Sequence, residues 1–187
     1  MERQLVERAR RGDREAYETL VRRKVAAVYR TALAVLGNEA DAHDAVQDAF
    51  LAAWRRLPSL RDADRFDAWL GRITLNACRM ALRRRRGVRE IAMTDQAEPR
   101  ATAGAAREPA DPATSDLEAA SVSADAFDRA FGRLSVDQRA LIVLRHLEGL
   151  PVADIGARLG IPTGTVKSRL HHARLALQRA LAREDRP

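Results

Sequence analysis

Apolar residues recur at helical spacing over long stretches of this chain, and this periodicity constrains the fold more than any other feature. Between residues 41 and 57 they fall at i, i+3 and i+4, on one side of a helix. The opposite side of that helix is acidic and amide-bearing, with Asp41, Asp44, Gln47 and Asp48. A second apolar stripe runs from 66 to 77, and the sequence stays compatible with a helix to about Arg86. Aromatic residues make up only 4% of the chain. We therefore expect an all-α fold.

Helix ends can be read from the residues between these stripes. An earlier helix is expected from about Tyr17 to Leu36, with Gly37 directly after it, and Pro58 stops the 41–57 helix. In the C-terminal third, Ser135 and Gln138 form a capping box that opens a helix ending at Gly149. A short helix follows, from Pro151 to Gly160, and after the break GIPTG a third helix begins near Thr163. This order predicts a helix-turn-helix.

Charge divides the chain into three segments. The 187 residues carry a formal net charge of +7. Residues 1–87 hold 19 basic and 12 acidic side chains, residues 88–126 hold 3 and 8, and residues 127–187 hold 11 and 6. The middle segment is rich in Ala, Pro, Thr and Asp and has no apolar periodicity. We expect two small helical domains, 1–87 and 127–187, joined by a flexible acidic linker, 88–126.

The third helix of the C-terminal domain has a face suited to the major groove of DNA. Val166, Leu170, Ala173 and Leu177 recur on its inward side. Its outward side is small and polar with basic flanks, and the proposed DNA contacts there are Thr165, Lys167, Ser168, Arg169, His171 and His172. Hydroxyl and imidazole groups can contact base edges, while cations contact phosphates. We favour groove binding over an ordinary solvated surface.

The 66–86 helix has a basic stripe opposite its apolar one. The stripe is made of Arg72, Asn76, Arg79 and Arg83, and it runs into the four consecutive cations 83–86. An arginine run alone is typical of a solvated helix end. Because this run extends an existing stripe, contact with a nucleic-acid backbone is favoured. Trp54, Phe66 and Trp69 are expected mainly in the core, although an aromatic ring at the rim can stack on an unpaired base.

These same residues resemble a known family. The stretches DAHDAVQDAFLAAWRRL and FDAWLGRITLNACRMALRRRRG are similar to region 2 of the sigma-70 family, and LSVDQRALIVLRHLEGLPVADIGARLGIPTGTVKSRLHHARLAL is similar to region 4. The GTVKSRL helix also resembles LuxR-type regulators. Both regions together, with no domain between them, resemble the extracytoplasmic-function group of sigma factors.

The resemblance implies roles for the two domains. Region 2 would bind core RNA polymerase at a coiled coil of the β′ subunit through Asp41, Asp44, Gln47 and Asp48. The 66–86 helix, with Arg72, Asn76, Arg79 and Arg83, would open and hold the melted −10 element. Region 4 would contact the β flap and the −35 duplex, and the linker would enter the polymerase cleft. The resemblance also implies promoter-specific initiation and control by an anti-sigma factor. His171 and His172 stand where the family often has an aromatic residue or Arg, so the −35 sequence stays open.

Two other functions compete with this one. The chain could be a stand-alone regulator that binds DNA as a dimer through 127–187, but the acidic helix face and the arginine stripe would then have no role. An enzyme is disfavoured because no nucleophile, base and orienting group cluster in the sequence. We expect no cofactor and no metal site, and a structural role for the single cysteine, Cys78. Since no long apolar run or signal peptide is found, we also expect no membrane insertion and a cytoplasmic location.

Overall fold

The structure, a computed structural model, describes residues 1–94 and 115–184, with side chains for 1–85 and 124–184. Within these ranges the chain is helical and contains no β-strand, so the expected all-α class is confirmed. The N-terminal domain contains α1 (Glu2–Arg10), α2 (Arg14–Leu36), α3 (Glu39–Arg56) and α4 (Phe66–Thr94). Two short 3-10 turns, Leu57–Ser59 and Ala63–Arg65, join α3 to α4.

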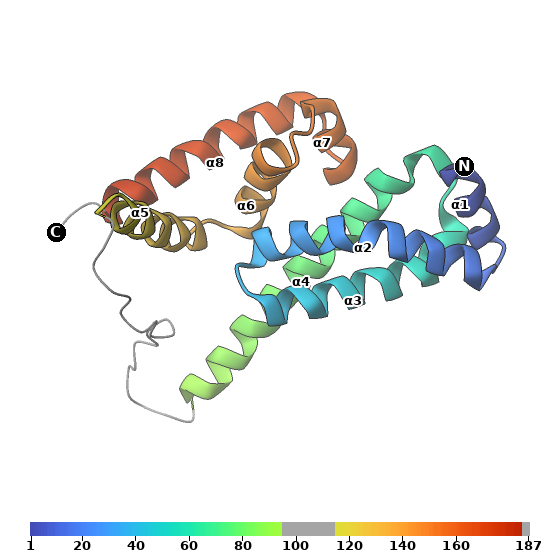
Figure 1. Cartoon of the computed structure of the whole chain (residues 1–187), viewed down its shortest axis with the longest axis horizontal. Helices are drawn as coiled ribbons and strands as arrows, with labels where there is room; N and C mark the ends of the chain where they lie inside the picture. The colour runs from blue at the N-terminus through green and yellow to red at the C-terminus, as the bar shows by residue number, and fades with distance from the viewer. Residues whose placement is uncertain (95–114, 185–187) are drawn as a thin grey trace.

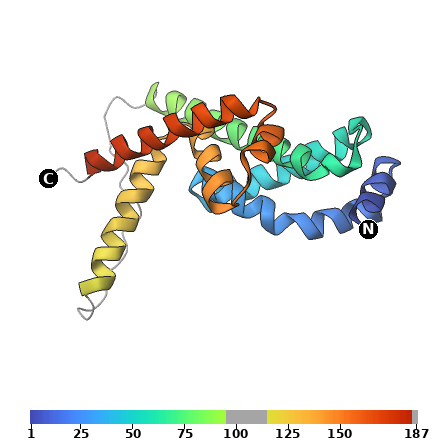
Figure 2. The same ribbon diagram turned by 90° about the horizontal axis from the view of Figure 1, so that it is seen from above.

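The C-terminal domain contains α5 (Ser115–Gly132), α6 (Val136–Ile142), α7 (Val152–Leu159) and α8 (Thr163–Glu184). The turn Val143–Leu147 continues α6 as a π-helix. In Figure 1, α6 and α7 lie between the long α8 and the bundle of α2, α3 and α4. Seen from above, α5 crosses α8 and projects away from the rest of the molecule (Figure 2).

Local signals explain where the helices begin and end. Asp13 accepts a hydrogen bond from the Ala16 amide at the start of α2, and α2 ends at Gly37, whose φ of 77° is left-handed. Asn38 caps α3 through the Asp41 amide. The expected capping box is confirmed at α6, where the amide of Gln138 donates to Ser135 Oγ and the amide of Ser135 donates to Gln138 Oε1.

The expected stretch 88–126 is described only at its two ends. Residues 88–94 continue α4, and 115–126 belong to α5. Residues 95–114 lie outside the described residues, as do 185–187. The domain boundaries 1–87, 88–126 and 127–187 therefore stay predictions.

One apolar core runs through both domains. In the N-terminal bundle it contains the buried face of α3, with Ala45, Ala49 and Ala53, and the expected α4 stripe that begins at Phe66. The same cluster continues into α6, α7 and α8 through residues such as Leu141, Leu144, Ile155 and Val166. A second cluster holds α5 against α8. No helix in the described part of the chain has the length and apolar character needed to cross a membrane.

Candidate nucleic-acid interface

The helix-turn-helix in the structure depends on a close approach between α7 and the turn after it. Gly160 ends α7 with a φ of 69°, in the left-handed region. A Cβ on Gly156 would lie 2.8 Å from the carbonyl oxygen of Ile161, so only glycine fits there without a backbone shift. This contact fixes the angle at which α8 leaves the turn.

The inward side of α8 packs as the periodicity predicted. Val166, Leu170 and Ala173 are buried, and Leu177 packs against the second cluster. The proposed DNA contacts are on the other sides of α8, away from this buried stripe. Lys167, Ser168, Arg169, His171 and His172 are exposed, and Thr165 is half-buried.

Hydrogen bonds already engage part of this outward face. The Ser168 hydroxyl donates to the carbonyl of Thr165, at 3.1 Å. Arg174 Nη2 lies 3.4 Å from Nε2 of His146, a residue outside the proposed DNA contacts. His171 and His172 meet edge to face with ring centroids 5.7 Å apart. Within the described residues, no three His, Cys, Asp or Glu side chains gather as metal ligands.

The basic stripe of α4 faces the C-terminal domain. Arg72 Nη2 donates to the carbonyl of Ala157 at 2.9 Å. Arg79 donates from Nε to Asp137 Oδ1 at 2.8 Å and from Nη1 to Asn76 Oδ1 at 2.5 Å. Arg83 is exposed. Two arginines of the stripe thus contact α6 and α7.

A cleft of about 800 Å³ opens where this stripe meets the helix-turn-helix. One wall is made of Arg61, Asp62, Arg65, Trp69 and Arg72, and the other is the turn 160–163 with part of α7. Trp69 is half-buried, whereas Phe66 is fully in the core. A cationic cleft with an aromatic wall suits unpaired bases and their phosphates. The sequence indicated Trp69 and Arg72 but not Arg61 and Arg65, which precede the helix and lie outside its periodicity.

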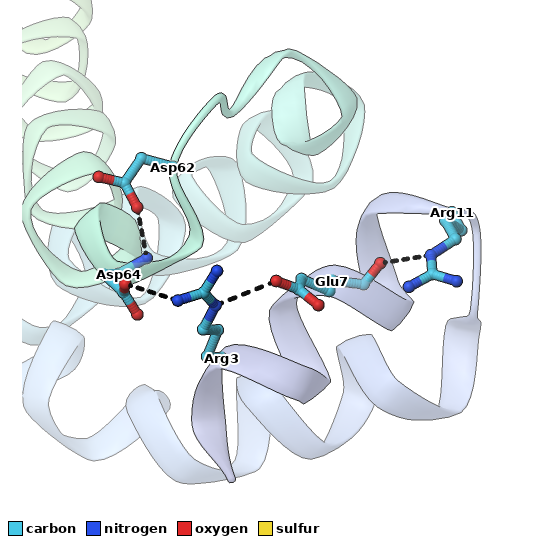
Figure 3. A network of polar contacts seen from close by, with 5 residues as sticks. All are labelled: Arg3, Glu7, Arg11, Asp62 and Asp64. Carbon is cyan, nitrogen blue, oxygen red and sulfur yellow. Dashed lines mark hydrogen bonds and ion pairs between the residues drawn. The ribbon is translucent and has the colours of Figure 1, made fainter.

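A polar network links α1 to the loop that forms this wall (Figure 3). Arg3 pairs with Glu7 at 3.1 Å and with Asp64 at 3.2 Å, and the amide of Asp64 donates to Asp62. Arg11 adds a hydrogen bond from Nε to the carbonyl of Glu7. Exposed ion pairs of this kind contribute little to stability, because water screens them. They connect α1 to the loop.

Lys24 connects α2 to the same region. Its ammonium lies 2.8 Å from a carboxylate oxygen of Glu2 and 2.7 Å from one of Asp67, at the start of α4. Burial alone lowers the pKa of Lys24, but the hydrogen bonds to Asp67 and Glu2 outweigh it and raise the pKa. Lys24 therefore stays charged and joins α1, α2 and α4.

The acidic face of α3 is paired in part with the arginine run of α4. Asp44 and Gln47 are exposed, while Asp41 and Asp48 are half-buried. Asp48 pairs with Arg84 at 2.7 Å, and Asp41 lies 3.5 Å from Arg85. The arginine run of α4 thus partly neutralises this face. These pairs are exposed, so a partner's cations can replace the arginines at small cost.

An apolar groove of about 470 Å³ begins beside Gln47, between α2 and α3. Its walls include Tyr17, Phe50 and Trp54, with Leu51 at its rim, 49% exposed. The Tyr17 hydroxyl donates to the carbonyl of Phe50 at 2.6 Å, and burial raises the pKa of Tyr17 to about 12. The periodicity did not indicate Leu51, because it lies off the buried stripe. The acidic face and this groove form a surface with both charge and apolar area.

Comparison with known proteins agrees with this division into two regions. The family profile for Sigma-70 region 2 matches residues 20–88, and that for Sigma-70 region 4 matches residues 124–177. The ECF RNA polymerase sigma factor SigM of Mycobacterium tuberculosis is 38% identical over 170 residues, which cover 91% of this chain and 79% of SigM. The ECF RNA polymerase sigma-E factor of Escherichia coli K12 is 34% identical over 92% of this chain and 90% of its own length.

Two solved structures are similar over nearly the whole chain. CnrH, in complex with the cytosolic domain of CnrY, has a TM-score of 0.64 and 32% identity, with 99% of both chains covered. The sigma factor RpoE of Bartonella quintana, in complex with the anti-sigma factor NepR, has a TM-score of 0.60 and 29% identity, covering 91% of this chain and 98% of RpoE.

Proposed function

The chain belongs to the extracytoplasmic-function group of the sigma-70 family, and from this premise we propose that it binds core RNA polymerase and directs it to promoters. In this role α8 reads the −35 duplex and the α4 stripe contacts the melted −10 element. The acidic face of α3 binds the polymerase. In this role the chain itself catalyses no reaction. It works in the cytoplasm, where its partner RNA polymerase is.

The observation that carries the proposal is the exposed face of α8. Five of its six candidate residues are exposed beside a buried stripe that fixes the helix on its domain. The helix-turn-helix geometry presents such a face to a major groove about 12 Å wide. Lys167 and Arg169 would lie nearest phosphates, and Ser168, His171 and His172 nearest bases.

The polymerase-binding role rests on the combination found on α3. Asp44 and Gln47 are exposed to solvent, and an apolar groove adjoins them. Asp41 and Asp48 form ion pairs with arginines of α4 that a partner's cations can replace. A basic coiled coil of the β′ subunit fits the charge, and an apolar side chain on it fits the groove. The proposed contact of region 4 with the β flap rests on the family resemblance.

Reconstituted transcription tests the whole proposal. Core polymerase with and without the protein is given sheared genomic DNA from the source cells, and transcript starts are mapped. We expect discrete starts that share upstream motifs and depend on the protein. Tight duplex binding by the protein alone, with no new transcript starts, would instead support the stand-alone dimeric regulator.

Control by an anti-sigma factor is part of the proposal. It is supported by the two similar solved structures, one of which holds the anti-sigma factor NepR. A tagged copy purified from its own cells should bring a second protein with it. Adding that protein to the reconstituted assay should abolish the motif-dependent starts, and unchanged transcription would contradict this assignment.

A further inference from the structure

The loop between α3 and α4, residues 57–65, supplies part of the wall of the cationic cleft and has little regular structure of its own. It contains the two short 3-10 turns, and its Arg61 and Arg65 line the cleft. Leu57 and Leu60 are buried and attach the loop to the core. Because a single 3-10 turn is held by few hydrogen bonds, the direction of the two arginines depends on the elements that contact the loop.

Helix α1 is one of these elements, since it packs against the second turn of the loop. Val6 and Ala9 are buried and hold α1 on the bundle. At the start of α1, Arg3 pairs with Asp64, whose amide donates a hydrogen bond to Asp62 of the cleft wall (Figure 3). Among the described residues, those of α1 do not line the cleft themselves. Helix α1 can therefore act on the cleft only through its contacts with the wall.

Lys24 of α2 makes a second connection between α1 and the cleft wall. Its ammonium group lies 2.8 Å from a carboxylate oxygen of Glu2 and 2.7 Å from one of Asp67. The Lys24 side chain is 18% exposed, against 64% for Arg3, so water screens the charge of Lys24 less. Asp67 is in the first turn of α4, two positions before Trp69 of the cleft wall. Lys24 thus connects the start of α1 to the start of α4.

The two connections meet the cleft wall at neighbouring points. Asp64 and Asp67 lie on either side of Phe66, where the loop ends and α4 begins. Exposed ion pairs add little to stability, but a binding site discriminates between ligands only if its side chains are held within roughly 0.5 Å. The Sigma-70 region 2 profile begins at residue 20, so α1 precedes the part of the chain that matches the family model. A role for α1 therefore has to be argued from these contacts.

We propose that α1 positions the 57–65 loop through Arg3 and Lys24, and so sets how sharply the cleft discriminates between the bases of a melted strand. Both are positioning residues, which act on the strand through Asp64 and Asp67. The ligand, unpaired DNA bases, rests on the proposed function. The order of the loop does not depend on that function and can be measured separately.

Substitutions at two positions remove the connections. Lys24→Met deletes the ammonium group and keeps a long apolar side chain, while Arg3→Gln removes the charge that pairs with Asp64. The two changes are also combined in a double variant. Arg23→Met is the matched control, because Arg23 is an exposed cation beside Lys24 on α2. Lys24→Arg is the conservative variant, since a guanidinium group can also pair with two carboxylates. Circular dichroism checks that helix content is unchanged in all of them.

Hydrogen exchange of the full chain measures the order of the loop without any ligand. Three loop amides donate hydrogen bonds within the loop, that of Leu60 to Leu57 and those of Asp64 and Arg65 to Asp62. We expect these amides to exchange at least about threefold faster in the double variant, because local opening becomes easier. Lys24→Arg and Arg23→Met should exchange like wild type. Wild-type rates in the double variant, or equal acceleration in the control, would overturn the inference.

Reconstituted transcription from a promoter library randomised at −10 and −35 measures base discrimination. A wrong base pair usually costs a DNA-binding protein roughly tenfold in affinity, and we expect this factor to fall to about threefold at −10 in the double variant. Preference at −35 should stay as in wild type. Equal losses at both elements would show a merely structural role, and unchanged −10 preference would refute the positioning of the cleft. A wild type that gives no protein-dependent starts would refute the proposed function, while hydrogen exchange still decides whether α1 positions the loop.

Discussion

His171 and His172 lie beside each other on the exposed face of α8, while Lys167 and Arg169 flank that face. Their chemistry predicts two different kinds of contact. An imidazole near a base edge reads sequence, whereas a cation near a phosphate adds affinity without sequence preference.

Substitutions on α8 should separate these two roles. We expect His171→Ala and His172→Ala to change −35 preference, at a cost of about 1–3 kcal/mol per good contact. Lys167→Ala should weaken all promoters alike. Transcription from a library of −35 sequences measures both effects, and unchanged preference in both histidine variants would show that α8 is turned differently on the duplex.

Glu184 illustrates a residue whose role depends on its partners in space. At the end of α8, with its side chain 8% exposed, it accepts a hydrogen bond from Arg129 Nε at 2.7 Å and lies 2.5 Å from Arg133 Nη2. The Arg129 hydrogen bond, aided by the charges of both arginines, lowers the pKa of Glu184 below its ordinary 4.5, against the effect of burial. The ion pair with Arg129 connects α5 to the end of α8, and the ion pair with Arg133 connects the turn after α5 to it.

The lowered pKa predicts a pH dependence of stability. Because the folded pKa lies below the unfolded one, the stabilisation is complete above the unfolded value and is lost as pH falls through the folded value. We expect Glu184→Gln to lower the free energy of unfolding at neutral pH and to flatten its fall below about pH 5. Urea unfolding at several pH values measures this, and an identical pH profile in the variant would refute it.

At the scale of elements, the turn between α7 and α8 depends on Gly156. Gly156→Ala should destabilise the C-terminal domain by about 1–3 kcal/mol, because the new methyl group meets backbone, which cannot move aside cheaply. Gly164→Ala is the control, since a Cβ there has no atom within 4 Å. Thermal unfolding gives the melting temperatures of the two variants. Equal values would contradict the close approach of Gly156 to the carbonyl oxygen of Ile161.

The α3 face gives a second prediction at this scale. Reversing charge in the double variant Asp44→Lys and Asp48→Lys should weaken binding to core polymerase and leave helicity unchanged. Asp125→Lys, an exposed reversal on α5, is the control. Affinity measured by fluorescence anisotropy with labelled protein checks this, and equal affinities for the double variant and the control would refute the assigned surface.

Several helix ends and caps could be predicted from the sequence because their causes are local, whereas α1 and α5 were not predicted. Gly37, the Ser135–Gln138 box and the α8 stripe each act within one or two turns. The pairing of Glu148 with Thr31 could not, because the two residues lie in different domains, 117 residues apart. For α4, one apolar stripe could be read from the periodicity, but the burial of Thr74 could not, because a threonine adds nothing to a hydrophobic pattern.

At the scale of the whole molecule, the proposed function requires the α4 stripe and α8 to reach two promoter elements at the same time. Replacing residues 95–114 by a Gly/Ser segment of equal length should keep motif-dependent transcription. Replacing them by five residues should abolish it, because such a segment spans at most about 17 Å. Full transcription from the short variant would show that the domains need not act apart.

The exposed face of α8 and its buried stripe are on opposite sides of one helix. A substitution on the exposed face therefore leaves the packing that folds the domain intact. Promoter preference and fold stability can thus change independently of each other in this chain.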